Sequence, residues 1–172
     1  MTALEARQLH STPRRYEIPD LLQTIFIAEL LSPSRCIWLV SPWISDIPVV
    51  DNRSDAFSTV EPAWSEQNVR LSAVLAWLCN RGTTIHVATR NVDHNHAFLE
   101  SLRARSPSAK THIHIADQLH EKGLLGDGYY LSGSMNFTHG GISTYEEMVH
   151  YFVAPSVVGQ NRIAFTHRWG GE

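Results

Sequence analysis

Segments in which hydrophobic residues recur with helical spacing alternate along the chain with short apolar or alternating segments. This pattern predicts helices and strands that follow one another. Helical spacing and helix end signals predict four helices, at 21–31, 69–81, 93–105 and 156–169. Short apolar or alternating runs predict five strands, at 36–41, 83–89, 111–116, 129–134 and 147–153. The alternation of helices and strands predicts an α/β fold, in which a mixed β-sheet is sandwiched by helices.

Two segments lack this periodicity. Residues 1–17 are polar, and we expect a flexible N-terminal segment there, followed by a single domain over 18–172. Residues 46–68 contain scattered Pro, Asp, Asn and Ser, which predicts a long loop after the first strand. Long loops in compact domains are often functional, so this one is a candidate lid or interface element.

The composition narrows the class of protein. A chain of 172 residues with 43% hydrophobic residues can bury one sizeable core. A formal net charge of -3 excludes a strongly basic nucleic-acid binder, so any grip on a phosphate polymer must come from a local patch. Cys36 and Cys79 lie in apolar stretches, which favours buried thiols over a disulfide or a reactive thiol.

The chain carries no sequence signal for a membrane. The N-terminal residues lack the apolar core of a signal peptide, and no apolar run reaches about 18 residues. We therefore expect a cytoplasmic protein with no membrane span.

The candidate chemistry begins at His120 and Lys122, which are two residues apart. In an extended chain both side chains point to the same side. A nucleophilic imidazole beside a cation suits a phosphate ester, because the cation neutralises the oxygens while the imidazole attacks phosphorus. Lysine is rare here, Lys110 being the only other one, so a lysine at this position is not background.

Further polar residues follow within a short distance. The sequence GLLGDG predicts a turn that returns Asp127 toward the same edge. Ser134 and Asn136 repeat the two-residue spacing and offer a hydroxyl and an amide to phosphate oxygens. Gly133 allows a close approach of backbone. These residues extend the candidate phosphate site.

The motifs resemble those of the phospholipase D superfamily. HEKGLLGD is similar to the HxK(x)4D signature through His120, Lys122 and Asp127, and GSMN at 133–136 is similar to the downstream GSxN element. CIWLVSPWI and LAWLCNRGTTIHVAT also resemble elements of this family. The resemblance covers most of the chain, apart from the first few residues and the 46–68 loop, and it implies a phospholipase D-like fold.

The resemblance leaves two residues for the acidic group that follows the GSxN element. The expected position is Glu146, and Glu147 is its competitor. The family often has an asparagine two positions before that glutamate, whereas this chain has Thr144.

The resemblance also implies a mechanism. His120 would form a phosphohistidine, while Lys122 and Asn136 hold the phosphate oxygens. Glu146 or Asp127 would orient an imidazole. No metal or other cofactor is required by such chemistry.

The resemblance implies a second copy of the chain as well. A second histidine is needed, and no other histidine is followed by lysine two positions on. Family members with one motif form a two-fold homodimer with the active site at the interface, and we expect the same here. Ser134, Gly133 and Trp43 are the expected substrate contacts.

The other paired histidines allow an alternative reading as a metal site. His94 and His96 form one HxH pair, and His112 and His114 form another. No acid or thiol completes a recognisable set, so ordinary polar histidines are favoured. His112 and His114 are expected on the strand face opposite to Ile113.

The favoured substrate is nucleic acid, because small single-motif members resemble bacterial nucleases. Stand-alone members of this size also resemble components of bacterial DNA-modification or defence clusters, which makes a larger defence complex an alternative setting. Two other functions stay open, a phospholipid headgroup hydrolase and a non-catalytic phosphate- or nucleic-acid-binding subunit.

Overall fold

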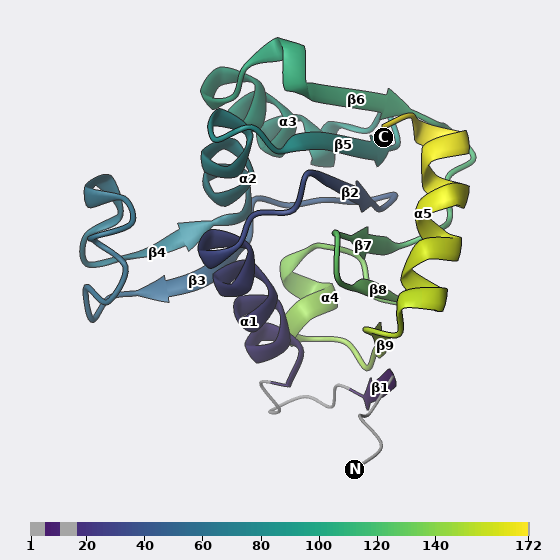
Figure 1. The fold of residues 1–172 in the computed structure, drawn as a ribbon, viewed down its shortest axis with the longest axis horizontal. Coiled ribbons are helices and arrows are strands. Elements are labelled where there is room, and N and C mark those ends of the chain that lie inside the picture. Colours follow the sequence, from purple (N-terminus) through teal and green to yellow (C-terminus); the bar gives the residue numbers. More distant parts are fainter. Residues whose placement is uncertain (1–5, 11–16, 172) are drawn as a thin grey trace.

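A seven-stranded mixed sheet forms the centre of the protein (Figure 1). The computed structural model describes residues 6–10 and 17–171. In chain order the sheet strands are β1 (Ala6–His10), β2 (Cys36–Val40), β5 (Thr84–Thr89), β6 (Thr111–Ile115), β7 (Gly123–Leu125), β8 (Tyr130–Gly133) and β9 (Met148–Phe152). They are arranged in the order β1-β9-β8-β7-β2-β5-β6.

The pairing of the strands brings distant segments together at one edge. β2, β5 and β6 are parallel, whereas β7, β8, β9 and β1 continue the sheet in antiparallel pairs. Val40, the last residue of β2, is opposite Gly123, the first residue of β7, which is in turn opposite Ser132 on β8. The carboxyl ends of β2 and β5 therefore lie beside the start of β7 and the end of β8.

Helices cover both faces of the sheet. The helices are α1 (Glu17–Leu31), α2 (Leu71–Asn80), α3 (Asp93–Arg105), α4 (His139–Ser143) and α5 (Pro155–Trp169). Alternate residues of β2 separate the two layers. Ile37 and Leu39 join the core with α1, α2 and α3, and Trp38 joins a second core with α5 (Figure 1). This arrangement confirms the predicted mixed sheet sandwiched by helices.

Several predicted element bounds need correction. Within the segment 1–17, for which no strand was predicted, residues 6–10 form β1, in which Leu9 is buried and pairs with Val149 on β9. The remainder of that segment up to residue 16 lies outside the described residues. GLL at 123–125 was expected in a turn, but it is β7, whose buried residues cross the centre of the sheet.

The predicted 46–68 loop is largely an arm with its own structure. β3 (Pro48–Asn52) pairs antiparallel with β4 (Gln67–Arg70), and a short 3-10 helix, η1 (Pro62–Trp64), lies between them. Figure 1 shows this hairpin projecting from the side of the molecule next to α1 and α2. Asn52 is fully buried and donates to Trp64 O at 2.8 Å. Hydrogen bonds of this kind stabilise the arm, and the hydrophobic pattern of the sequence does not reveal them.

Both cysteines are buried, as the apolar stretches around them predict. Cys36 contributes to the α5 core, and Cys79 to the core on the other face. Within the described residues, no helix is both long and apolar enough to cross a bilayer.

Candidate active site

His120 and Lys122 lie at the sheet edge, in the segment that leads into β7. The Lys122 Nζ atom donates to His120 O at 2.7 Å and is 3.4 Å from His120 Nδ1. The two side chains are therefore on the same side, as their spacing predicts. His120 is exposed and Lys122 is half-buried. An accessible imidazole thus lies beside a cation that the protein partly shields from water.

The surroundings of Lys122 shift its pKa. Desolvation by partial burial lowers the pKa of Lys122, and the nearby positive charge of Arg90 lowers it further. Glu147 opposes both effects. These surroundings disfavour the charged form of Lys122. A phosphate bound beside the ammonium group would favour the charged form, because it adds negative charge.

Ser134 and Glu147 form a second part of the site. The Ser134 hydroxyl donates to a carboxylate oxygen of Glu147 and accepts a hydrogen bond from Met148 N at 3.1 Å. Glu146, by contrast, is exposed. The structure thus places Glu147, rather than Glu146, beside Ser134 and within electrostatic range of Lys122.

Gly133 makes this arrangement sterically feasible. Its φ is +150°, and a Cβ atom there would lie 2.0 Å from Met148 O. The backbone of Gly133 therefore lies close to the backbone of β9, and this is the close approach that the glycine was expected to allow. It brings Ser134 N within 3.0 Å of Met148 O and sets Ser134 against Glu147.

Asn136 is held by the loop that follows β2. The Ser41 hydroxyl lies 3.3 Å from Asn136 Oδ1 and 2.8 Å from Trp43 O. The same two segments are joined a second time, because Ser45 N donates to Phe137 O at 2.8 Å. The loop after β2 therefore orients the Asn136 amide at the same edge as Lys122.

Arg90 is a site residue that lies outside both motifs. It follows β5, and its Nε donates at 2.7 Å to Leu119 O, immediately before His120. Its Cζ lies 5.0 Å from the ring centroid of Trp43. A basic residue at the carboxyl end of a parallel strand was the available signal, because ligands bind at such ends.

Asn95 holds the two loops that carry Trp43 and Arg90. It is fully buried at the start of α3. Its Oδ1 accepts from Ile44 N at 2.8 Å, and its Nδ2 donates to Pro42 O at 3.0 Å and to Arg90 O at 2.9 Å. One side chain thus joins the loops after β2 and β5. No sequence motif identifies a helical asparagine as a residue that joins two loops, so this role could not be predicted.

Asp127 does not return to the His120 edge as expected. It lies in the β7–β8 turn, at the end of β7 away from Lys122. Its carboxylate accepts from Arg162 Nη1 at 2.7 Å and from Arg35 N and Nε at 3.0 and 3.2 Å. Desolvation raises its pKa, but these hydrogen bonds prevail and lower it below the ordinary value. The expectation was wrong because three strand residues separate Asp127 from Lys122.

The two HxH pairs lie in separate places, one on α3 and the other on β6. His94 Nε2 lies 2.9 Å from Ser45 Oγ. His112 and His114 stack on His86, on the sheet face opposite to Ile113 as predicted, with ring centroids 4.7 and 5.4 Å from that of His86. In the described part of the chain, no group of three or more His, Cys, Asp or Glu is arranged to hold a metal ion.

Comparison with known proteins identifies the fold to which this structure is similar. No model of a known protein family matches the sequence, and no curated protein matches it either. Among solved structures, NucT from Helicobacter pylori superposes with a TM-score of 0.60 at 12% identity, covering 95% of both chains. Nuc, a phospholipase D family member from Salmonella typhimurium, gives a TM-score of 0.61 at 12% identity, covering 95% of this chain and 93% of its own.

The chain has a phospholipase D-like fold. Phosphatidylserine synthase from Haemophilus influenzae contains a similar unit, with a TM-score of 0.59 at 10% identity over 95% of this chain and 38% of that one. The fold therefore agrees with the resemblance that the two motifs indicated.

In this phospholipase D-like fold the motif edge is shallow. The cavity beside Lys122 and Gly133 has a volume of only about 10 Å³. Two cavities of about 620 and 670 Å³ lie elsewhere, one against the β3–β4 hairpin and one against His86. Neither of these two cavities is lined by His120 or Lys122, and His120 is exposed at the sheet edge.

Proposed function

We propose that this protein is a cytoplasmic phosphodiesterase that cleaves nucleic acid through a phosphohistidine on His120. The observation that carries the proposal is the exposed His120 imidazole, 3.4 Å from the Lys122 ammonium at the sheet edge. A nucleophile and a cation at this separation can engage the same phosphate group.

The reaction would proceed in two displacements. In the first, an imidazole nitrogen of His120 bonds to phosphorus, and the bond from phosphorus to the leaving oxygen breaks. A second imidazole, acting as general acid, protonates that oxygen. In the second step the now neutral imidazole removes a proton from water, the water oxygen bonds to phosphorus, and the bond from nitrogen to phosphorus breaks.

Three groups would stabilise the charge that develops on the phosphate oxygens. Lys122 and Arg90 supply positive charge, and Asn136 supplies an amide. The lowered pKa of Lys122 favours this role, because a phosphate oxygen would offset both desolvation and repulsion by Arg90. These residues could stabilise the charge without a metal ion.

The second imidazole would be His120 of a partner subunit. The chain carries one HxK motif, and its His120 is exposed at the sheet edge. An isologous contact across this edge would bring two copies of the motif together and exclude water from the phosphate.

The decisive experiment is chelator-resistant cleavage of single- and double-stranded DNA and RNA. We expect His120→Ala and Lys122→Ala to abolish cleavage, whereas the matched controls His96→Ala and Lys110→Ala keep it. Bis(p-nitrophenyl) phosphate tests the same site without a polymer. Headgroup release from vesicles instead of nucleic-acid cleavage would replace the substrate class. Failure of wild type on every diester would leave a non-catalytic binding subunit, for example of a defence complex.

Mixing subunits tests the shared site. Wild type and His120→Ala are combined in equal amounts and allowed to exchange. If both histidines of a dimer are needed, about a quarter of the full activity should remain, whereas independent sites would keep about a half. Light scattering must show a dimer in the same buffer. An active monomer would refute the shared site.

A further inference from the structure

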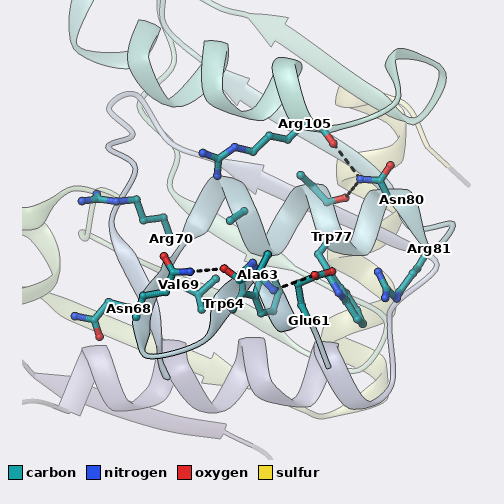
Figure 2. A pocket seen from close by; sticks show the side chains of 13 residues that line it. Glu61, Ala63, Trp64, Asn68, Val69, Arg70, Trp77, Asn80, Arg81 and Arg105 are labelled. Atoms are coloured by element: carbon teal, nitrogen blue, oxygen red, sulfur yellow. Dashed lines mark hydrogen bonds between the residues drawn. The ribbon is translucent and has the colours of Figure 1, made fainter. Parts of the chain in front are cut away.

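A basic cavity of about 620 Å³ lies between the β3–β4 hairpin and α2 (Figure 2). Its walls come from η1 and β4 on one side and from α2 and the end of α3 on the other. Much of it is thus built by the 46–68 segment, which the motif resemblance does not cover. The phosphodiesterase chemistry assigns no role to this cavity.

The charge of the lining differs from that of the whole protein. Arg70, Arg81 and Arg105 line the cavity, and Glu61 is the acidic residue of the lining. Figure 2 shows the three arginines distributed around its rim, with Arg70 and Arg81 toward its two ends. In a chain with a formal net charge of -3, this is the local basic patch that a phosphate polymer requires.

One of these arginines forms a flat platform. The Arg81 guanidinium lies over the Trp77 ring, with Cζ 3.6 Å from the ring centroid, and Arg81 is exposed. Trp64 packs beside Trp77 at 6.0 Å between ring centroids. A guanidinium held flat on an indole can stack against a nucleobase with little further loss of side-chain freedom.

The helical wall of the cavity is tied together. Asn80 on α2 donates through Nδ2 to Arg105 O at 3.0 Å, at the end of α3. The same nitrogen donates to Ala76 O at 2.9 Å (Figure 2). Arg81 and Arg105 are therefore carried by helices whose relative position is fixed, which favours a preformed site.

The Arg70 end of the cavity is connected to the candidate active site. Arg70 Nη1 donates to Asp46 O at 2.5 Å, and Asp46 also accepts from Ser72 N at the start of α2. The residue before Asp46 is Ser45, which is hydrogen-bonded to Phe137 beside Asn136. A strand that leaves the phosphate site along this loop would meet Arg70 first.

We infer that this cavity binds single-stranded nucleic acid at a distance from the cleaved bond. A base would stack on the Arg81–Trp77 platform, while Arg70 and Arg105 contact backbone phosphates. The inference rests on the proposed function, because it assigns the strand to the same substrate. An acidic peptide would use the arginines but would have no use for the stacking platform.

The test measures fluorescence anisotropy of a labelled single-stranded oligonucleotide with His120→Ala protein, which prevents cleavage. Adding Arg81→Ala or Arg105→Ala should weaken binding about 5- to 10-fold each, as expected for one stacking or phosphate contact. Arg103→Ala is the matched control, because Arg103 lies two residues from Arg105 on α3, is exposed and does not line the cavity. It should change binding less than about 2-fold.

An abasic oligonucleotide separates stacking from charge. It should bind less tightly than the normal strand, and Arg81→Ala should remove most of that difference. The inference is overturned if Arg81→Ala and Arg105→Ala bind like Arg103→Ala, or if polyglutamate displaces the strand as well as an unlabelled strand does. Circular dichroism checks that each variant is folded.

The proposed function is tested separately, by hydrolysis of bis(p-nitrophenyl) phosphate. If wild type cleaves this diester and His120→Ala does not, the catalytic site stands, whatever the cavity variants show. If the cavity variants lose the strand but wild type cleaves no diester, the cavity stands and the phosphodiesterase proposal fails.

Discussion

At the scale of single residues, the acidic group of the site is decided by contacts that the sequence could not distinguish. Glu146 and Glu147 are neighbours with the same chemistry. β9 begins at Met148, and the hydrogen bonds of Met148 to Ser134 direct the Glu147 side chain toward Ser134. Glu147 also offsets part of the repulsion that Lys122 experiences from Arg90.

Glu147→Gln tests this assignment. The change removes a charge-assisted hydrogen bond of about 1.5–3 kcal/mol and the negative charge near Lys122. We expect kcat on bis(p-nitrophenyl) phosphate to fall about 10- to 100-fold. Glu146→Gln is the matched control and should stay within about 2-fold of wild type. A larger loss in Glu146→Gln than in Glu147→Gln would reverse the assignment.

At the scale of elements, the two ends of the β7–β8 hairpin have different roles. The turn is held by ion pairs that stabilise the fold, and the open end carries the candidate active-site residues. The turn is anchored by Asp127, which ties Arg35 before β2 to Arg162 on α5. The open end carries Lys122 and Ser134. Asp127 thus belongs to the motif in sequence, yet it acts on the hairpin and on the packing of α5.

Asp127→Asn should therefore affect stability and not chemistry. Arg162 is mostly buried and would lose its charged partner, so we expect about 1–3 kcal/mol lower free energy of unfolding, measured by urea denaturation. The lowered pKa of Asp127 means that this contribution is present above its ordinary pKa and is lost as the pH falls below it. Hydrolysis of the small diester should change less than about 2-fold.

The control for Asp127→Asn is Asp93→Asn, because the Asp93 side chain is fully exposed at the start of α3. It should leave the unfolding free energy within about 0.5 kcal/mol of wild type. A loss of catalysis without a loss of stability in Asp127→Asn would restore Asp127 to the chemistry.

At the scale of the whole molecule, the two faces of the sheet differ in kind. One face is an aliphatic core beneath α1, α2 and α3. The other, beneath α5, includes His86, which is 5% exposed and stacked between Trp38 and His112. Desolvation, together with repulsion from His112 and His114, lowers the pKa of His86 to about 4.

This histidine should make the fold sensitive to acid. In the unfolded chain His86 titrates near the ordinary histidine pKa of 6.5, so between pH 6.5 and 4 the unfolded state binds a proton that the folded state excludes. The free energy of unfolding should fall through this window, by up to about 3 kcal/mol from His86. Above pH 6.5 both states are neutral and the effect vanishes.

Urea denaturation of wild type and His86→Phe at pH 7 and pH 4.5, at one protein concentration, checks this. The aromatic replacement keeps the stacking. Two carboxyl groups with shifted pKa values titrate in both proteins, Asp127 and the buried Glu29, whose pKa is raised by desolvation. The difference in pH slope between the two proteins therefore reports on His86. His96→Gln, which changes an exposed histidine, is the control. Equal pH slopes in wild type and His86→Phe would contradict the prediction.

The α/β order, the mixed sheet and the common side of His120 and Lys122 could all be predicted from the amino-acid sequence. These features rest on local periodicity and on a two-residue spacing, both of which are properties of short segments. The buried thiols of Cys36 and Cys79 follow from their apolar neighbours in the same way.

The positions of four residues depend on long-range contacts and could not be predicted: Arg90, Asn95, Glu147 and Asp127. Arg90 and Asn95 come from separate elements and meet the site because β2 and β5 are parallel neighbours. Asp127 leaves the site because β7 is a strand, whereas its three apolar residues had suggested part of a turn. Strand pairing across the sheet brings remote residues together, and no local pattern in the sequence records which ones.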